Sequence, residues 1–305
     1  MTLEISRKDV EGKDLTPYSS EDRFIKLPIE PYMDLLGVTP IPSQCAIINA
    51  INNPKYRFVC GAVSRRQGKT YISNIIGQLT ALVPNTHILI MSPNYSLSQI
   101  SFDLQRQLIR HFDLEVTKDN AKDRVIELSN GSTVRMGSIN QVDSCVGRSY
   151  DLIIFDEAAL VDGRDAFNVA LRPTLDKDNS KAIFISTPRG RNNWFADFFY
   201  RGFSDDFKEW VSIRATYHEN PRFSEEDIVE AKKSMSGAEF AQEYMADFNT
   251  YEGQIWAFDY EKCIADLSEL DTSKMDVIAG LDVGYKDPTA LCVVAYDWDS
   301  GNFYV

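Results

Sequence analysis

The sequence has few cysteines, few histidines and no long apolar run, and each shortage argues against a class of protein. Its five cysteines include no C-x-x-C pair, and three histidines are too few for a zinc framework. We therefore expect reduced thiols in a cytoplasmic protein. No apolar run reaches the ~18–20 residues that a membrane helix needs. The N-terminal residues MTLEISRKDVEGKDL lack the apolar core of a signal peptide, so secretion is not expected.

Positive charge is also scarce. The 32 lysines and arginines are outnumbered by 45 aspartates and glutamates, which gives a net charge of −13. A protein that binds nucleic acid at all times is normally basic, so this balance argues against such a role. It leaves room for a local basic patch used only after assembly. With 305 residues, 44% of them hydrophobic, the chain can hold one large globular domain, or one domain and part of another.

The stretch Arg57–Ile76 has the pattern of a phosphate-binding loop. An apolar run predicts a short buried strand, a polar turn follows, and apolar residues at helical spacing begin a helix. In this pattern Gly68 lets the backbone close around phosphates, Lys69 reaches the β- and γ-phosphates, and Thr70 offers its hydroxyl to Mg²⁺. We therefore predict that the whole turn binds ATP. Its residues are Ser64, Arg65, Arg66, Gln67, Gly68, Lys69 and Thr70.

A second motif makes the nucleotide hypothesis more specific. Val63 stands where the usual loop has its first glycine, so the loop alone leaves a plain strand-turn-helix open. Four apolar residues followed by Asp156 and Glu157 then form a Walker-B pattern at the end of a predicted strand. Asp156 is expected to hold Mg²⁺ through water, and Glu157 to orient or deprotonate the attacking water. The alternative, a turn of surface acids, is disfavoured by the G-K-T sequence upstream.

The order of the predicted elements indicates a parallel sheet with helices on its faces. Strand and helix patterns alternate after the P-loop, and Asn130-Gly131 marks a hairpin. The hydroxyls of Ser186-Thr187-Pro188 end the last strand of this series, at the edge where open parallel sheets bind ligands. The expected strands are 86–92, 124–128, 133–136, 151–155 and 181–186, and the expected helices are 43–52 and 95–112.

Gln44 lies in the first turn of the predicted helix 43–52, for which Ser43 is the expected N-cap. A glutamine amide can both donate to and accept from an adenine edge. On spacing alone, an exposed helical glutamine is an equally good interpretation.

Beyond residue 189 the pattern changes to a small helical subdomain and then to new strands. A helix over 192–203 and a strand over 209–214 come first, followed by a helix that Ser224 caps and a helical run over 237–248. Residues 251–274 are expected to lead into another domain. Its predicted strands are 276–283 and 289–297, with a third that begins at 302.

Five motifs in this order resemble the large terminases of tailed double-stranded DNA phages. SRRQGKT, LIIFDEAA and ISTPRG are similar to the packaging ATPase of this family. EFAQEYMADF and GLDVGYKDPTA resemble the family's linker and the opening of its RNase H-like nuclease domain. The resemblance runs from about residue 29 to the C-terminus. Val63 fits it, because the family uses a deviant loop of the S-R-x-x-G-K-T kind.

The resemblance implies roles that spacing leaves open. Arg65 matches a loop arginine that senses the γ-phosphate or acts as an arginine finger. Gln44 matches a glutamine that contacts adenine, and Ser186-Thr187-Pro188 match a motif that couples hydrolysis to domain movement. Arg148 is a candidate for contact across a subunit boundary, with a salt-bridged surface arginine as the alternative. Asp282 stands where the family places its first metal-binding nuclease carboxylate.

The expected architecture is an α/β P-loop NTPase of the RecA-like, additional-strand (ASCE) type. It carries a small helical subdomain and the beginning of an RNase H-like nuclease domain. The expected divisions are an N-terminal arm, the ATPase domain with its helical subdomain, a linker and the incomplete nuclease domain. Their ranges are 1–29, 30–250, 251–275 and 276–305.

The resemblance implies a motor that uses ATP and Mg²⁺ to translocate double-stranded DNA into a procapsid in the host cell cytoplasm. The implied partners are DNA, the portal protein, the small terminase subunit and further copies of the chain in a ring. The alternative is a superfamily-2-like helicase or remodelling ATPase, because D-E-A-A and S-T-P occur there too. Such an enzyme needs a second RecA-like domain, whereas G-L-D-V-G-Y-K-D favours the terminase. A non-hydrolysing ATP switch is opposed by Glu157.

The chain as given is not expected to cut DNA. An RNase H-like nuclease needs several carboxylates around two metal ions, and this sequence supplies only the first, Asp282. Strands of an unfinished sheet lack hydrogen-bond partners, so we expect Asp276–Val305 to be poorly ordered or to lean on another surface.

Overall fold

The computed structural model describes residues 18–19, 25–248, 267, 270–283 and 289–305. The chain divides into two compact units, Met1–Gly253 and Gln254–Val305. Most of the predicted arm and most of the predicted linker lie outside the described residues. At the end of the arm, however, Leu27 is 7% exposed and packs in the hydrophobic core, so this part of the predicted arm belongs to the folded unit.

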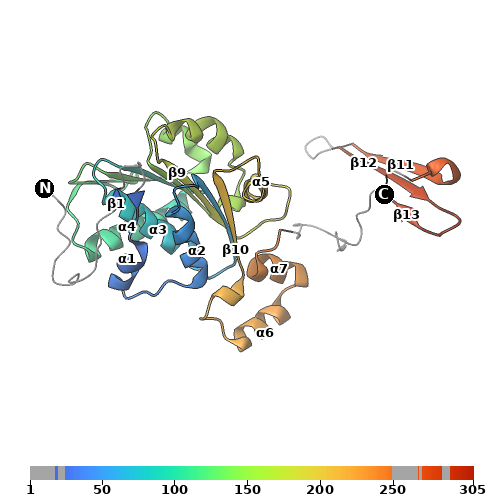
Figure 1. Cartoon of the computed structure of the whole chain (residues 1–305), viewed down its shortest axis with the longest axis horizontal. Helices are drawn as coiled ribbons and strands as arrows, with labels where there is room; N and C mark the ends of the chain where they lie inside the picture. Colours follow the sequence, from blue (N-terminus) through green and yellow to red (C-terminus); the bar gives the residue numbers. More distant parts are fainter. Residues whose placement is uncertain (1–17, 20–24, 249–266, 268–269, 284–288) are drawn as a thin grey trace. The chain divides into compact units, whose positions relative to one another are not determined.

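An eight-stranded sheet organises the described residues of the first unit (Figure 1). Its strand order is β10-β3-β9-β8-β4-β7-β6-β5. The first six strands of this order are parallel to their neighbours, and β6 and β5 are added antiparallel at one edge. The strands are β3 (Phe58–Val63), β4 (His87–Ser92), β5 (Val116–Asn120), β6 (Val125–Leu128), β7 (Thr133–Ser138), β8 (Leu152–Asp156), β9 (Lys181–Ser186) and β10 (Trp210–Ala215).

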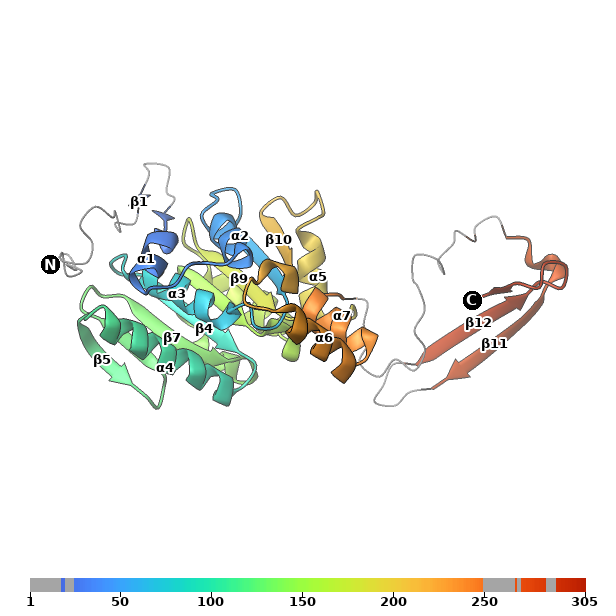
Figure 2. The ribbon, with the colours of Figure 1, turned by 90° about the horizontal axis from the view of Figure 1, so that it is seen from below.

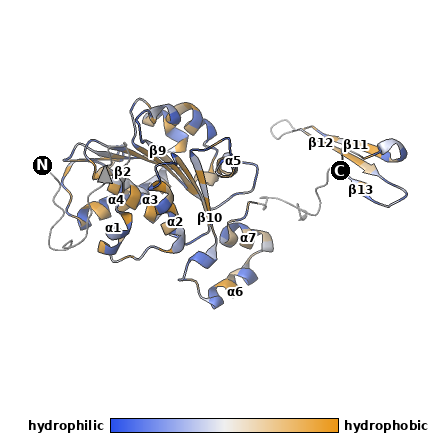
Figure 3. Ribbon diagram, viewed as in Figure 1, coloured by the Kyte–Doolittle hydropathy of each residue, from blue (hydrophilic) through white to orange (hydrophobic). Residues whose placement is uncertain are grey.

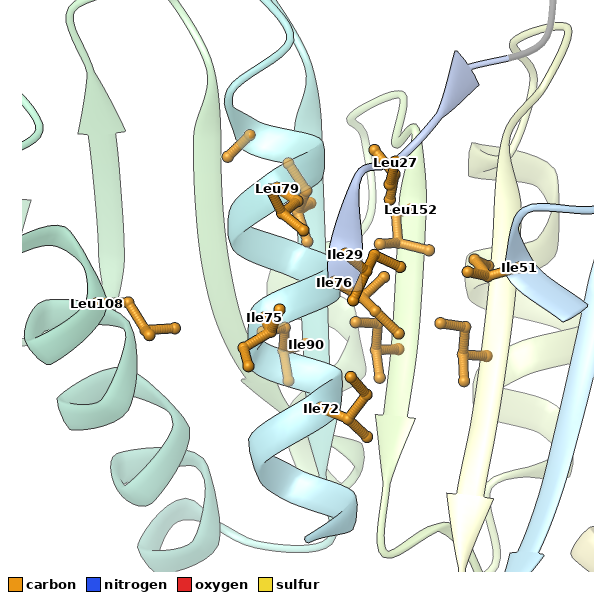
Figure 4. Close-up of a cluster of buried hydrophobic side chains, with 14 of the residues drawn as sticks. Leu27, Ile29, Ile51, Ile72, Ile75, Ile76, Leu79, Ile90, Leu108 and Leu152 are labelled. Carbon is orange, nitrogen blue, oxygen red and sulfur yellow. The ribbon is translucent and has the colours of Figure 1, made fainter. Parts of the chain in front are cut away.

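Four helices pack against one face of this sheet. They are α1 (Ile29–Leu35), α2 (Pro42–Ile51), α3 (Lys69–Ala81) and α4 (Tyr95–His111). Ile72, Ile75 and Ile76 of α3 lie against alternate residues of the strands, such as Ile90 of β4 (Figure 4). The period of two along each strand sends the intervening residues, such as Leu89, to the other face. Figure 3 shows the resulting concentration of hydrophobic residues in the central strands.

The second face is covered by an aromatic cluster. Helix α5 (Trp194–Arg201), the 3₁₀ segment Ile139–Cys145 and the π-helix Ala166–Leu171 supply its cover. The rings of Phe155 and Phe184 stack at 5.2 Å between centroids, and Phe167 meets both edge-on. Such pairs contribute roughly 0.5–1.5 kcal/mol beyond the area they bury. Both faces of the parallel strands are therefore dry, which explains their uninterrupted apolar sequences.

The helical subdomain consists of α6 (Glu225–Ser234) and α7 (Gly237–Met245), which follow the end of β10 (Figure 2). Ser224 caps α6 as predicted, and its hydroxyl accepts from the backbone N–H of Asp227. Helix α7 ends three residues before the predicted limit, because Ala246 adopts a left-handed conformation with φ 50°.

Some predicted elements differ from the structure. Helix α2 begins with Pro42 after Ile41, so Ser43 is not its N-cap and its hydroxyl is directed to another partner. Helix α1 and edge strand β5 were not predicted. A two-residue pair, β1 (Tyr18–Ser19) with β2 (Ile25–Lys26), precedes the core. In the described part of the chain, no helix combines the length and apolarity needed to cross a bilayer.

The second unit contains an antiparallel three-stranded sheet. Its strands are β11 (Asp276–Asp282), β12 (Ala290–Tyr296) and β13 (Phe303–Tyr304). The predicted strands are confirmed. Strands β11 and β12 pair along the whole of β11, from Asp276 opposite Tyr296 to Asp282 opposite Ala290. They therefore find hydrogen-bond partners within the unit, so the premise that strands of an unfinished sheet lack such partners is wrong for these strands.

Candidate functional site

The carboxyl ends of three adjacent strands form the candidate site. Strand β9 lies between β3 and β8 in the sheet, and all three are parallel. The predicted P-loop follows β3, Asp156 ends β8, and Ser186 ends β9. The strand order thus brings together three motifs that lie far apart in the sequence.

The P-loop turn requires a glycine at position 68 for two reasons. Gly68 has φ 70°, a left-handed conformation that L side chains rarely adopt, and it immediately precedes the first residue of α3. A Cβ atom there would lie 2.6 Å from Nε2 of Gln44. Arg66 also has a positive φ, 58°, and its carbonyl accepts a 2.8 Å hydrogen bond from the Asn220 amide. The backbone N–H groups at the start of α3 are available for an anion.

Lys69 is buried among oxygen atoms. Its Nζ donates to the Ser64 carbonyl at 3.2 Å and to Thr187 Oγ1 at 2.9 Å. Glu157 Oε1 lies 3.7 Å away. The lysine side chain is only 7% exposed, so these contacts fix its charge at the centre of the site.

Asp156 and Thr70 form the polar pair next to this lysine. Thr70 Oγ1 donates to Asp156 Oδ2 at 2.7 Å. The other carboxylate oxygen, Oδ1, is buried and has no hydrogen-bond partner among the described residues. Burial, and secondly the charge of Glu157, raise the pKa of Asp156 to about 6. A carboxylate oxygen without a partner next to a hydroxyl matches the oxygen donors that Mg²⁺ prefers, so these residues fit the expected ion.

Glu157 connects the Walker-B strand to the predicted coupling motif. Its backbone is left-handed, with φ 51°, which is uncommon for a non-glycine residue and typical of functional sites. Ser186 Oγ lies within hydrogen-bond distance of Glu157 Oε2, at 3.3 Å. Thr187 contacts both Lys69 and the Val63 carbonyl. Pro188 follows directly and is buried.

Arg65 is held by the helical subdomain. Its Nε pairs with the carboxylate of Glu243 in α7, and its backbone N–H donates to the Glu243 carbonyl at 2.9 Å. Arg189, directly after the coupling motif, also contacts this carboxylate, at 3.3 Å. Glu243 is 11% exposed as a side chain and was not predicted, because nothing in its local sequence distinguishes it from other helical glutamates.

Gln44 lies beside the loop, as its prediction required, and its amide makes two hydrogen bonds within the protein. Oε1 accepts from the Ile41 N–H at 3.1 Å, and Nε2 donates to the Gln67 carbonyl at 3.2 Å. Ser43 Oγ donates to Gln67 Oε1 at 2.8 Å, and Gln67 Nε2 reaches the Thr216 carbonyl at 2.7 Å. Ser43 and Thr216 therefore support the loop, and no local sequence signal marks either of them for this role.

The arginine predicted to act across a subunit boundary does not join this site. Arg148 is exposed, lies four residues before β8, and forms no ion pair with any residue in the described ranges. The pKa of His87, the first residue of β4, is lowered by burial, then by the charge of Lys177, and to a smaller extent by Arg148. Arg148 therefore lies near the amino ends of the strands, whereas the candidate site lies at their carboxyl ends. Asp282 belongs to the second unit and is exposed at the end of β11. The part of the chain that the structure describes contains no group of three or more metal-binding side chains.

The comparisons with known proteins agree with this geometry. A family model described as the terminase large subunit, T4-like-virus type, N-terminal part, matches residues 60–262. The large terminase subunit of Escherichia phage T5 is 47% identical over 310 residues, which cover 99% of this chain and 70% of that protein.

Two solved structures share the fold. The large terminase ATPase domain of Thermus phage P74-26 has a TM-score of 0.60 and 24% identity, over 71% of this chain and 96% of that one. A large terminase from a thermophilic bacteriophage, solved in complex with ADP, has a TM-score of 0.59 and 17% identity, over 85% and 65% of the two chains. The predicted fold class, an α/β P-loop ATPase of the ASCE type, is confirmed.

Proposed function

The chain belongs to the terminase large-subunit family and carries the ATPase domain of that packaging motor, and from this premise we propose how its residues hydrolyse ATP. One observation carries the proposal: two sets of contacts meet at the carboxyl ends of the strands. Lys69 donates to Thr187 and lies 3.7 Å from Glu157. Thr70 donates to Asp156, the residue directly before Glu157.

The phosphates of ATP lie on the turn Ser64–Gly68 and the first N–H groups of α3. Lys69 supplies a positive charge toward the β- and γ-phosphates. Mg²⁺, when bound, offsets the phosphate charge, and Thr70 and Asp156 are the residues that hold it. The unpartnered Oδ1 of Asp156 supports this assignment, because a buried carboxylate oxygen otherwise lacks compensation for its burial.

Glu157 orients the attacking water and accepts its proton. It lies one residue beyond the metal-holding aspartate, and Ser186 is within hydrogen-bond distance of one of its oxygens. Ser186 thus responds to a change at Glu157, and Thr187, which accepts a hydrogen bond from Lys69, responds to a change at that lysine. This supports the coupling role proposed for the Ser186-Thr187-Pro188 motif.

Two arginines are candidates for the positive charge that offsets the negative charge developing on the phosphates during hydrolysis. Arg65 is in the loop itself but is paired with Glu243, so contact with a phosphate requires it to exchange that partner. Arg148 is exposed and remote from the P-loop of its own chain. It is therefore suited only to the site of a neighbouring copy, as in a ring-shaped motor.

The chain's place in packaging follows from the family. We propose that it acts on double-stranded DNA with the portal protein and the small terminase subunit, in the host cell cytoplasm. Cleavage of DNA by a two-metal site requires further carboxylates besides Asp282. The helicase alternative is not retained, because the family match covers residues 60–262 and the T5 relative aligns along almost the whole chain.

The direct test is phosphate release from ATP in the presence of Mg²⁺. Glu157→Gln should lower turnover by at least ~10²-fold while ATP binding persists, because only the proton acceptor is lost. Lys69→Ala should instead lose both turnover and most of the binding, because the charge toward the phosphates is removed. Parental turnover in Glu157→Gln would show that the Walker-B assignment is wrong.

A further inference from the structure

Two arginines from different segments meet one carboxylate beside the P-loop. The side chain of Glu243 in α7 is 11% exposed, and its Oε2 accepts a hydrogen bond from Arg65 Nε. Its other oxygen, Oε1, lies 3.3 Å from Arg189 Nη1. Arg65 comes shortly after β3 and Arg189 shortly after β9, so this carboxylate joins the helical subdomain to the ends of two strands that border the candidate site.

The backbone and the side chain of Arg65 are held differently. The backbone N–H donates to the Glu243 carbonyl at 2.9 Å, whereas the arginine side chain is 59% exposed. The guanidinium group can therefore move while the backbone contact persists. A guanidinium group pairs with phosphate oxygens in the same way as with carboxylate oxygens. Glu243 thus occupies the group that Arg65 would offer to a phosphate.

Arg189 has a donor that its contact with Glu243 does not use. Its Nε is buried and has no hydrogen-bond partner among the described residues, although its Nη1 lies next to the carboxylate. A buried N–H without a partner costs free energy, so a second carboxylate oxygen in reach of this group would be stabilising. Once Arg65 leaves, the Glu243 carboxylate therefore still has a charged partner and can give it a second contact.

We propose that Glu243 competes with the γ-phosphate of ATP for the side chain of Arg65. In the ligand-free chain the carboxylate holds this arginine. When ATP binds, Arg65 moves to the γ-phosphate and the carboxylate turns to Arg189. Glu243 acts through Arg65, so it is a positioning residue that sets the affinity for the triphosphate. This inference rests on the proposed ATPase function.

Nucleotide binding measured by isothermal titration calorimetry tests the competition. Glu243→Gln removes the charge and keeps the backbone contact with Arg65. With Mg²⁺ present, we expect the Kd for ATP-γ-S to fall about fivefold, the factor that the upper range for a partly exposed ion pair predicts. The Kd for ADP, which has no γ-phosphate, should stay near the parental value. A merely structural role predicts weaker binding of both nucleotides, and that result would overturn the proposal.

Two controls separate competition from a general loss of negative charge. In a chain that carries Arg65→Ala, adding Glu243→Gln should leave the Kd for ATP-γ-S unchanged, because no arginine remains to be released. Asp247→Asn removes the same charge just beyond α7, where the carboxylate lies 3.9 Å from Arg214, and should change neither Kd. Tighter binding of ATP-γ-S in either control would contradict the proposal.

Arg189 provides a test of opposite sign. Arg189→Gln removes the second partner of the carboxylate, so the release of Arg65 becomes less favourable. We expect binding of ATP-γ-S to weaken about fivefold, and the further substitution Glu243→Gln to abolish this loss. A loss that persists in the double variant would contradict the proposal, because Arg189 would then act on the phosphates itself.

The two proposals fail in different ways. A parental chain that binds neither nucleotide, or that releases no phosphate from ATP, would refute the proposed function. A parental Kd for ATP-γ-S in Glu243→Gln, with phosphate release intact in the parental chain, would refute only the competition.

Discussion

At the scale of single residues, the burial of Asp156 links stability to pH. Its pKa is raised from 3.8 to about 6, chiefly by burial. The folded chain then holds more protons than the unfolded chain between these two values, so this group lowers stability as pH rises through the interval. Above about pH 6 the full cost applies, at most about 3 kcal/mol.

Replacing this carboxylate should therefore stabilise the ligand-free chain while it removes activity. Asp156→Asn keeps an oxygen that accepts from Thr70 but carries no charge. We expect its free energy of urea unfolding to exceed the parental value at pH 7.5, and the difference to shrink toward zero near pH 4. Asp205→Asn, at an exposed loop position, is the matched control and should show no such trend. A difference that does not change with pH would contradict the assignment.

Glu243 shows how one buried carboxylate is shared by two segments. Its partners are Arg65 in the P-loop and Arg189 after the coupling motif. Both arginines keep some contact with solvent, with side-chain exposures of 59% and 28%, so they are partly rehydrated when the carboxylate is removed. Removing this carboxylate should therefore lower the free energy of unfolding by about as much as losing a hydrogen bond, and by less than breaking a buried ion pair.

At the scale of elements, Glu243 attaches helix α7 to the P-loop. In Glu243→Gln we expect the free energy of unfolding to fall by about 1 kcal/mol. Hydrogen exchange should become faster at the Arg65 amide, which donates to the Glu243 carbonyl, and through α7. Glu230→Gln on the exposed face of α6 is the control. Unchanged exchange at Arg65 would show that the backbone contact alone holds the two elements together.

At the scale of the whole molecule, the position of Arg148 predicts that copies of the chain cooperate. If it completes a neighbour's site, turnover per chain should rise with protein concentration. Arg148→Ala should remove that rise, whereas Arg110→Ala, which deletes another exposed arginine on α4, should not. Strict proportionality at all concentrations, with Arg148→Ala silent, would leave Arg65 as the compensating charge.

The second unit leads to a prediction about DNA cleavage. Asp282 ends β11, and the described residues place no cluster of metal-binding side chains around it. Two-metal cleavage needs several carboxylates, so the chain should leave supercoiled plasmid intact with Mg²⁺ or Mn²⁺. The products are separated on an agarose gel. Nicking that disappears in Asp282→Ala would show that a smaller metal site exists.

The sequence by itself determined the elements whose signals are local. The P-loop and the Walker-B strand were predictable because an apolar run followed by a fixed set of polar residues encodes both a strand end and its chemistry. The hairpin at Asn130-Gly131 and the Ser224 cap follow from turn and capping preferences in the same way. The short helix α1 and the exposed strand β5 have weaker patterns, and they were missed.

Only the tertiary structure decided which of these residues meet. The strand order β10-β3-β9-β8 brings Thr187 to Lys69 and the segment after β10 to the P-loop, and no local pattern specifies that order. Glu243 becomes a partner of Arg65 because α7 folds back on the loop. Arg148 lies away from the site because it precedes the amino end of β8, whereas the site is at the carboxyl end. Contacts between distant segments depend on how the sheet is assembled, which explains why the chemistry was predictable and its supporting residues were not.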